Sequence, residues 1–354
     1  MLNILLKTVK ITIISVYLIF IAGSVVRMTG SGMGCPDWPK CFGYTIPPTT
    51  EEQLTWKANT TFEKGVIIIV NEALYVAKKD ITTSQQFKSS NWEAYTKHEY
   101  ATFNVYHTWT EYINRLSSVL SGFVFVFLIG ILIFQKIFKK QSFVKGTGVL
   151  VFLAFLGMGF EAWLGKVVVD SFLSPYVITF HMIGGLLIIG LLLRTQFLVE
   201  QAIQPIKFMA TNQIQKLFKT LLMISLLMMV VQILLGTQVR QFVDTQVKLF
   251  GFEHKEFRLL NPSLKFYIHR SYTILIVLIN AFLFWLNIKY KLGFKNMKWV
   301  MALLLFEAVT GILMYYVNFP FGTQAIHLLS GALLYGILLY LFFKTTISTK
   351  NSIS

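Results

Sequence analysis

The chain has 354 residues, of which 55% are hydrophobic and only 14% are charged, and its formal net charge is +16. This composition excludes an ordinary soluble domain and indicates an integral membrane protein. The basic residues lie in short clusters between apolar segments, a distribution that excludes a nucleic-acid-binding face and is typical of a membrane protein.

Eight apolar runs are long enough to cross about 30 Å of hydrocarbon at about 1.5 Å per residue. In chain order they cover residues 8–27, 112–135, 147–168, 176–195, 217–239, 266–288, 299–318 and 323–343. The first run has no small-x-small cleavage site and is predicted to be a retained span. We predict an all-α membrane protein with eight transmembrane helices, arranged as two parallel-repeat four-helix bundles over residues 1–200 and 201–354.

The connections between these runs differ in charge. Lysine clusters lie within residues 7–10, 136–145, 207–219, 289–298 and 344–350. The positive-inside rule places these clusters and both termini in the cytoplasm, so the large loop 28–110 lies outside. Within that loop the apolar run 66–70 is too short to span, and we predict an interfacial or packed helix there. We expect the loop to cover the outer mouth of the bundle.

Several short phrases occur twice along the chain, which we interpret as a duplicated half. The next His follows Glu161 and Glu307 at the same spacing (181 − 161 = 327 − 307 = 20). The matching phrases are Tyr112-Ile113-Asn114-Arg115 with Tyr267-Ile268-His269-Arg270, Phe160-Glu161-Ala162-x-x-Gly165 with Phe306-Glu307-Ala308-x-x-Gly311, and Gly23-x-x-Val26-Arg27 with Gly236-x-x-Val239-Arg240.

His269 and His327 each lie just inside an apolar run, at matched depths of the repeat. An isolated His in a membrane helix often only hydrogen-bonds a neighbouring helix. Two such residues on equivalent helices point instead to a haem iron, which accepts two axial imidazoles from facing helices. Gly185 and Gly331 follow His181 and His327 by one turn and could make room for a porphyrin edge, although small residues also serve helix packing.

Four arginines lie at the same outer level as these histidines. Guanidinium groups at this depth could pair with haem propionates, or they could be snorkelling anchors without such a partner. The four are Arg27, Arg115, Arg240 and Arg270.

The first half departs from the symmetry, because Asn114 stands where the repeat predicts His. An amide is a poor iron ligand, so this half either lost six-coordination or obtains an imidazole elsewhere. His107 and Glu111 share a helical face with Asn114, but His107 lies about 10 Å from it along the axis. We interpret the first half as the reactive one.

Glu111 has no acidic counterpart in the second half, where Phe266 stands at the equivalent position. A carboxylate there could move protons or stabilise a cation, or it could be an interfacial Glu in contact with water. Glu161 and Glu307 occur in both halves, so we predict a structural role such as orienting a His or an Arg.

Cys35 and Cys41 are the two cysteines of the chain, and they enclose a short segment on the outer side. A disulfide is plausible in that oxidising setting, whereas the spacing does not match a zinc site. The pair could be a structural staple or a redox-active pair that passes electrons to the reactive haem.

Taken together, these phrases resemble the haem A synthase family over nearly all of the chain. The most specific part is Gly30-Ser31-Gly32-Met33-Gly34-Cys35-Pro36-Asp37-Trp38-Pro39-x-Cys41. The resemblance implies a b-type haem in the C-terminal half, ligated by His269 and His327. It also implies that haem O binds in the N-terminal half, with His181 as an axial ligand and Glu111 as the acidic residue required for the reaction. The methyl group of haem O would be hydroxylated successively to the formyl group of haem A.

Asn114 departs from the commoner family pattern, so the substrate iron would be held by His181 alone or by His181 with His107. No transit peptide is apparent, so we expect a bacterial inner membrane location in preference to a mitochondrial one. The partner expected from the pathway is a farnesyl transferase, the haem O synthase. The sequence leaves a homo-oligomer open. Two rival hypotheses are a di-haem b electron-transfer cytochrome, which would have two complete His pairs, and a proton-relaying transporter, whose repeats are more often inverted.

Overall fold

A computed structural model describes residues 1–96, 103–137, 144–205 and 212–346. Within these ranges eight helices are long and apolar enough to cross a membrane, and each predicted span overlaps one of them. They are α1 (Leu2–Thr29), α2 (Val105–Ile137), α3 (Thr147–Asp170), α4 (Pro175–Ile203), α5 (Asn212–Phe250), α6 (Leu264–Lys289), α7 (Met297–Tyr316) and α8 (Thr323–Thr345). Parts of the predicted lysine clusters, including Lys139, Lys140, Lys207 and Lys350, lie outside the described residues.

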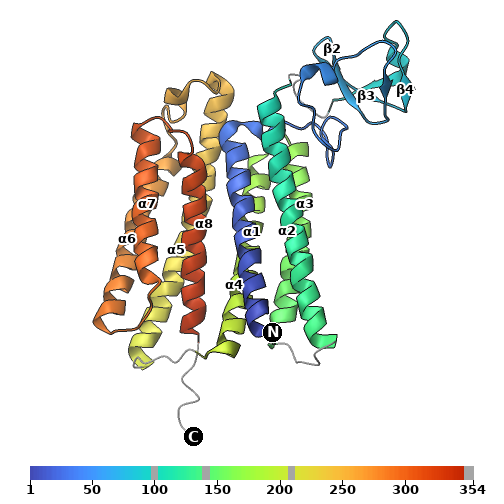
Figure 1. Ribbon diagram of the computed structural model, residues 1–354. Helices are drawn as coiled ribbons and strands as arrows, with labels where there is room; N and C mark the ends of the chain where they lie inside the picture. Colours follow the sequence, from blue (N-terminus) through green and yellow to red (C-terminus); the bar gives the residue numbers. More distant parts are fainter. Residues whose placement is uncertain (97–102, 138–143, 206–211, 347–354) are drawn as a thin grey trace.

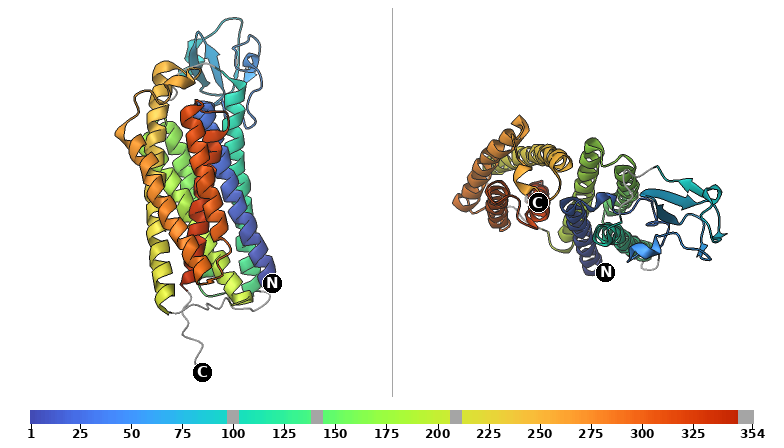
Figure 2. Two further views of the ribbon diagram at one scale, coloured as in Figure 1. Left: turned by 90° about the vertical axis from the view of Figure 1, so that its left-hand side faces the viewer. Right: turned by 90° about the horizontal axis from the view of Figure 1, so that it is seen from above.

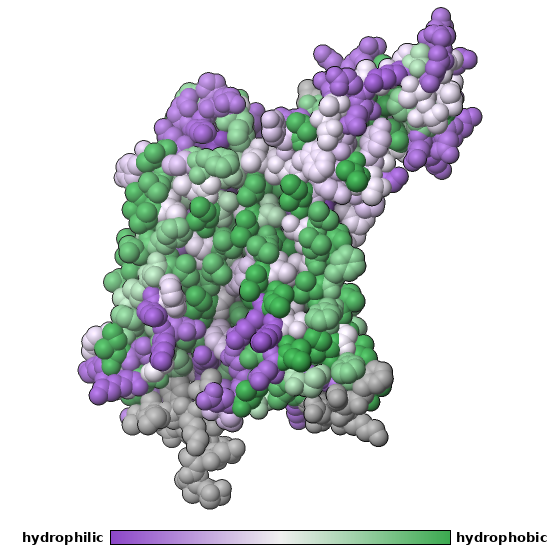
Figure 3. All heavy atoms as spheres, viewed as in Figure 1, coloured by the Kyte–Doolittle hydropathy of each residue, from purple (hydrophilic) through white to green (hydrophobic). Residues whose placement is uncertain are grey.

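The eight helices run side by side in an elongated bundle (Figure 1). Helix α1 begins at the end of the bundle where α8 stops, and the strands lie at the other end. On the face that Figure 3 shows, apolar residues cover the middle of the bundle between two more polar ends, as a lipid-facing surface requires. The chain is therefore a multi-pass membrane protein, which confirms the prediction of eight transmembrane helices.

The helices pack as two groups, which we name the first helix group (α1–α4) and the second helix group (α5–α8). In the first group α1 and α3 each pack against both α2 and α4, so that α2 and α4 lie at opposite corners. In the second group α6 and α8 lie at opposite corners in the same way. Helix α8 packs against α1 and α4, and it joins the two groups (Figure 2).

Each helix group has its own cluster of buried apolar side chains, and Tyr17 and Phe20 of α1 pack against both clusters. The Tyr17 hydroxyl reaches α8, where it donates a hydrogen bond to the Ala332 carbonyl at 3.4 Å. Gly336 allows this approach, because a Cβ there would collide with the Tyr17 hydroxyl. Close packing of this kind stabilises the association of helices in lipid, because the hydrophobic effect does not drive helices together there.

The long outer loop forms small antiparallel sheets instead of the predicted helix. The strands are β1 (Thr61–Phe62), β2 (Ile67–Val70), β3 (Ala73–Ala77), β4 (Ile81–Thr82) and β5 (Trp92–Ala94). They pair as β1-β4 and as β2-β3-β5. Short 3-10 helices within the described residues cover Ser31–Met33, Glu51–Gln53, Ser89–Asn91 and Lys255–Phe257. The prediction of a helix over 66–70 is wrong. Asn71 and Glu72, both with positive φ, form a tight turn that pairs the β-branched run with β3.

This sheet region lies at the outer end of α2 and projects beyond the edge of the bundle (Figures 1 and 2). It does not extend over the second helix group, so the expectation that the loop covers the outer mouth of the whole bundle is not met. Contacts with α2 hold the beginning of the loop, for example the hydrogen bond from the Trp109 indole to the Pro48 carbonyl at 3.2 Å.

Two helices extend farther outward than the apolar runs indicated. Helix α2 begins at Val105 because the Asn104 side chain accepts hydrogen bonds from the N–H groups of Tyr106 and His107. Helix α5 continues beyond residue 239 to Phe250 and ends at Gly251, which has a φ of 91°. The helix is therefore longer than the predicted run 217–239, and the extension adds Asp244 to α5.

Candidate functional site

The four positions singled out by the repeat lie at one end of the bundle. Asn114, His181, His269 and His327 all fall within the first three turns of their helices, which begin at the end where the sheet region lies (Figure 1). The four positions therefore lie at a similar depth in the bundle, as the repeat predicts.

In the second helix group, His327 of α8 is fixed by side chains of α7. Its Nδ1 lies 3.0 Å from a Glu307 carboxylate oxygen and 2.8 Å from the Thr310 hydroxyl oxygen. The Ser330 hydroxyl donates a hydrogen bond to the other Glu307 oxygen. With Nδ1 engaged, Nε2 is the ring nitrogen left for a metal, which is the usual arrangement of a carboxylate-oriented ligand.

His269 lies on α6, the helix at the corner opposite α8. Its Nδ1 is buried, and among the described residues it has no hydrogen-bond partner. Its ring faces Gly236 of α5, where an added Cβ would lie 3.2 Å from the ring Cε1. His269 and His327 lie in the first two turns of α6 and α8, which occupy opposite corners of the second helix group. The structure therefore places the two predicted ligands at one end of the same helix group.

The first helix group repeats one half of this arrangement. Nδ1 of His181 on α4 lies 2.5 Å from a carboxylate oxygen of Glu161 on α3. The Glu161 side chain is buried, whereas the His181 side chain is 42% exposed and accessible to a ligand. The prediction that Glu161 and Glu307 orient histidines is confirmed by both contacts.

Asn114 occupies the position of His269 in the first group. Its side-chain oxygen lies 3.7 Å from where a Cβ of Gly23 would be, just as His269 faces Gly236. Gly165 and Gly311 face His181 and His327 in the same way, at 3.8 and 3.9 Å. The glycines of the repeated phrases thus face all four positions, although the repeat alone did not indicate which residue each glycine contacts.

The space beside Gly185 is already filled. A Cβ there would lie 2.8 Å from the ring of Phe20 on α1, so this glycine serves helix packing and the porphyrin-edge interpretation is wrong for it. A Cβ on Gly331 would lie 3.8 Å from the nearer carboxylate oxygen of Glu307.

Glu111 is buried at 3% exposure, which excludes a water-exposed interfacial carboxylate. One carboxylate oxygen accepts a hydrogen bond from the Cys35 N–H at 2.8 Å, and the other pairs with Arg115. Arg115 also donates to the carbonyls of Asp37 and Lys40. Glu111 and Arg115 thus bind the backbone of the cysteine loop, residues 34–43, to α2.

Cys35 and Cys41 form a disulfide in this loop, and both are buried. The Asp37 carboxylate accepts hydrogen bonds from the N–H groups of Phe42 and Gly43 at 2.6 and 2.9 Å. Burial raises the pKa of Asp37 above its ordinary value of 3.8, although these N–H groups and Arg115 act in the opposite direction. The prediction of a disulfide is confirmed, and the bonds show how the loop is held.

Arg27 and Arg240 share a partner that sequence analysis missed. Asp244 lies 2.7 Å from an Arg27 nitrogen and 2.8 Å from an Arg240 nitrogen. Arg240 also donates to the Arg27 carbonyl at 2.8 Å and to the Gln324 side chain. These bonds join α1, α5 and α8 at the outer end of the contact between the two groups.

Arg270 and His107 are less enclosed. Arg270 is exposed and lies over the rings of Phe266, Tyr267 and Tyr315, at 5.7 to 6.0 Å from their centres. His107 lies two turns outward from Asn114, where its backbone carbonyl contacts Gly34 so closely that a Cβ there would collide. The structure therefore does not bring His107 to the level of Asn114.

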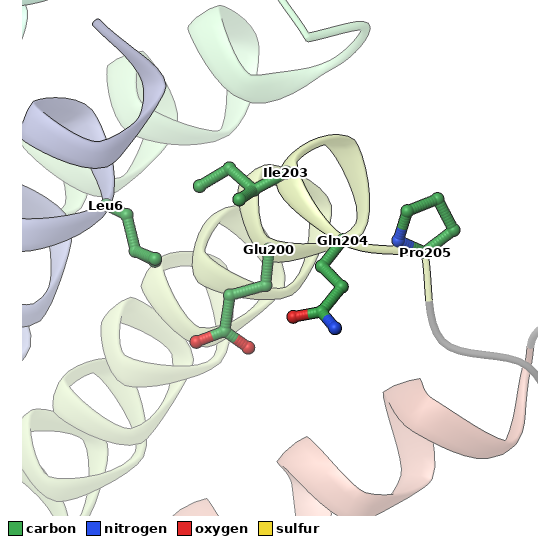
Figure 4. A pocket seen from close by; sticks show the side chains of 5 residues that line it. All are labelled: Leu6, Glu200, Ile203, Gln204 and Pro205. Atoms are coloured by element: carbon green, nitrogen blue, oxygen red, sulfur yellow. The ribbon is translucent and has the colours of Figure 1, made fainter.

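A surface cavity of about 430 Å³ lies at the opposite end of α4 (Figure 4). It is lined by Leu6, Glu200, Ile203, Gln204 and Pro205. Glu200 is held there by Tyr340, by Gln196 at 2.9 Å and by Lys10 at 3.2 Å. It lies about 28 Å from His181 along the helix, so this cavity is separate from the histidine site.

The residues of the second helix group fit a bis-imidazole haem. Two imidazoles come from opposite corners, one is oriented by Glu307 and Thr310, and the other has a buried nitrogen without a partner. Glycine stands against each ring, where a side chain would narrow the space for a flat macrocycle.

Comparison with known proteins agrees with this site. Residues 7–65 and 69–339 match the COX15-CtaA family, described as cytochrome oxidase assembly protein. A heme A synthase of Shewanella oneidensis is 25% identical to the chain over 227 residues, which are 64% of this chain and 54% of that protein. The matched region thus spans about half the length of that relative. Since the family match covers most of its length, the chain belongs to the COX15-CtaA family of cytochrome oxidase assembly proteins.

Proposed function

We propose that the protein is a haem A synthase, which oxidises the methyl group of haem O to the formyl group of haem A within the membrane. The observation that supports this most directly is the pair of carboxylate-oriented histidines, His181 with Glu161 and His327 with Glu307, at matched positions of the two helix groups. Family membership and the similarity to a heme A synthase support the same activity.

In this proposal the two groups are the halves of a duplicated unit, residues 1–200 and 201–354. The second half holds a resident haem b between His269 and His327, with Arg240 and Arg270 near its outer edge. When bound, haem b supplies one-electron chemistry. The chain fixes the orientation of the His327 ring through Glu307 and Thr310 and keeps the His269 ring in a buried setting.

The first half binds the substrate, haem O, with His181 as axial ligand. Asn114 lies at the opposite corner, and Arg27 and Arg115 lie at the outer level, where the propionates of the substrate would be. His107, two turns outward, is the other histidine among the described residues of this half. The bonds of Arg27 to Asp244 and of Arg115 to Glu111 compete with any propionate for these guanidinium groups.

Glu111 is the proposed catalytic carboxylate of the first half. Its bonds to Arg115 and to the Cys35 N–H hold the carboxylate in one position on α2. A fixed negative charge there lowers the energy of positive charge that develops on the substrate during oxidation of the methyl carbon.

In this proposal the protein lies in a bacterial inner membrane with both termini in the cytoplasm. The lysine clusters support this orientation through the positive-inside rule. The enzyme that supplies haem O, a farnesyl transferase, is the expected partner, and self-association into a homo-oligomer is compatible with the exposed helix faces.

Pigment analysis of the purified protein tests this proposal. Haem O or haem A extracted together with haem B is expected, and a His269→Ala variant should lose haem B while it retains the other pigment. Haem B as the sole pigment would favour a di-haem b electron-transfer cytochrome instead. A colourless protein would favour a transporter.

A further inference from the structure

We propose that the N-terminal half binds its haem substrate through His181 alone, and that the iron face beside Asn114 accepts a neutral diatomic ligand, such as carbon monoxide, that hydrogen-bonds to the Asn114 amide. This inference rests on the proposed function, and it assigns to Asn114 a ligand-binding role that follows from its place in the structure.

The first step is the equivalence of Asn114 and His269. Each lies on the helix at the corner opposite its carboxylate-oriented histidine, and each faces a glycine of the neighbouring helix, Gly23 or Gly236. Where the second half presents an imidazole to the iron, the first half therefore presents a shorter side chain that ends in an amide. An amide does not compete with small ligands for iron.

The second step is the absence of another imidazole at this level. Within the described part of the chain, His107 is the remaining histidine of the first half, and it lies about 10 Å outward along α2. Its backbone is fixed there, because its carbonyl contacts Gly34 of the cysteine loop and the Thr108 hydroxyl donates to the Gly34 carbonyl at 2.8 Å. A shift of two turns would break the contacts of this loop with α2.

The third step concerns the free hydrogen-bonding capacity of Asn114. Among the described residues its side-chain amide has no hydrogen-bond partner, whereas the other polar side chains nearby, Glu111 and Arg115, are engaged with the cysteine loop. An amide carries two N–H donors and one oxygen acceptor. A donor on the open face of a haem strengthens the binding of small ligands that bear partial negative charge.

The test is a carbon monoxide titration of the dithionite-reduced protein with its pigments bound, followed by absorption and infrared spectroscopy. The wild-type protein should bind one carbon monoxide, at the haem that extracts as haem O or haem A. Asn114→His should weaken this binding by at least about tenfold, because the new imidazole must leave the iron before carbon monoxide can bind. Asn114→Leu, of similar size, should keep the stoichiometry but release carbon monoxide about five- to tenfold faster, with a higher C–O stretching frequency.

One further variant is a control. His107→Ala should leave the titration unchanged. A pigmented wild-type protein that binds no carbon monoxide, or a His107→Ala variant that gains a binding site, would overturn this inference while the proposed function stands. Haem B as the sole extracted pigment would overturn the proposed function and the inference with it.

Discussion

The Glu307 carboxylate lies 3.0 Å from Nδ1 of His327. A nitrogen that contacts a carboxylate in this way does not also bind a metal, so the metal would bind the other ring nitrogen, Nε2. The same relation holds between Glu161 and His181 at 2.5 Å. Nδ1 of His327 is thus engaged by Glu307 and Thr310, which leaves Nε2 for the metal, and Glu161 stands at the equivalent place beside His181.

Replacing Glu307 with Gln should weaken the retention of haem b by about 10- to 100-fold, the usual effect of removing a partner that orients a metal ligand. The haem-to-protein ratio after dialysis against apomyoglobin measures this loss. Glu161→Gln is the matched control, since it should lower the occupancy of the substrate pigment and leave haem b in place. Equal loss of both pigments in either variant would show a general folding defect instead.

Asp244→Asn should destabilise the contact between the helix groups. It removes the partner of Arg27 and Arg240, both largely buried, and partly exposed ion pairs contribute up to about 1 kcal/mol each. We expect a decrease of a few degrees in Tm in detergent. Asp170→Asn removes a more exposed pair, with Lys166 on the same helix, and should change Tm very little. A similar effect of both variants would contradict the role of Asp244 between the groups.

Replacing Cys35 and Cys41 with Ser should destabilise the cysteine loop by about 2 kcal/mol, as loop-closure entropy predicts for a short loop. Since the Cys35 N–H donates to Glu111, haem O turnover should fall as well. Thermal unfolding with and without reductant, together with conversion of haem O, measures both effects. A double variant with lowered stability and full turnover would show that the loop does not position Glu111.

Asp37 should stabilise the folded protein more at low pH than at neutral pH, which is the opposite of the usual effect of an Asp residue. Its pKa is raised in the folded chain, mainly by burial, so the folded protein takes up a proton at a higher pH than the unfolded one does. Its contribution to stability therefore rises as the pH falls through the raised value toward 3.8 and is constant below. The Tm difference between wild type and Asp37→Asn, followed from pH 7 to about pH 4, measures this contribution. Arg115 and Tyr95 also face Asp37, and a difference that does not vary with pH would exclude its titration.

Much of the site could be predicted from the sequence, because residues that recur at equivalent positions of the two halves indicate a shared role. The equal spacing from Glu161 to His181 and from Glu307 to His327 indicated the two contacts that the structure confirms. The eight membrane helices could be predicted from the length of the apolar runs alone. An unpaired backbone N–H or C=O group is costly in lipid, so a long apolar run in a membrane forms a helix, which satisfies its own backbone hydrogen bonds.

Other features depend on partners that sequence patterns do not reveal. Asp244 lies beyond the apolar run of α5, and Arg27, its partner, is 217 residues earlier. Phe20 fills the space beside Gly185 from a different helix. The run 66–70 is continuously apolar, so its pattern does not distinguish a strand from a helix. The turn at Asn71 and Glu72, which pairs this run with β3, makes it a strand.

The bonds of Arg27 also have a consequence for synthesis of the protein. The carboxylate that neutralises Arg27 leaves the ribosome 217 residues after it, a delay on the order of 10 to 40 seconds at the usual rate of translation. During that interval Arg27 has no Asp244 to pair with. The ion pair between α1 and α5 can therefore form only after the fifth helix has been made, so a nascent chain arrested before Asp244 should lack this link between the two helix groups.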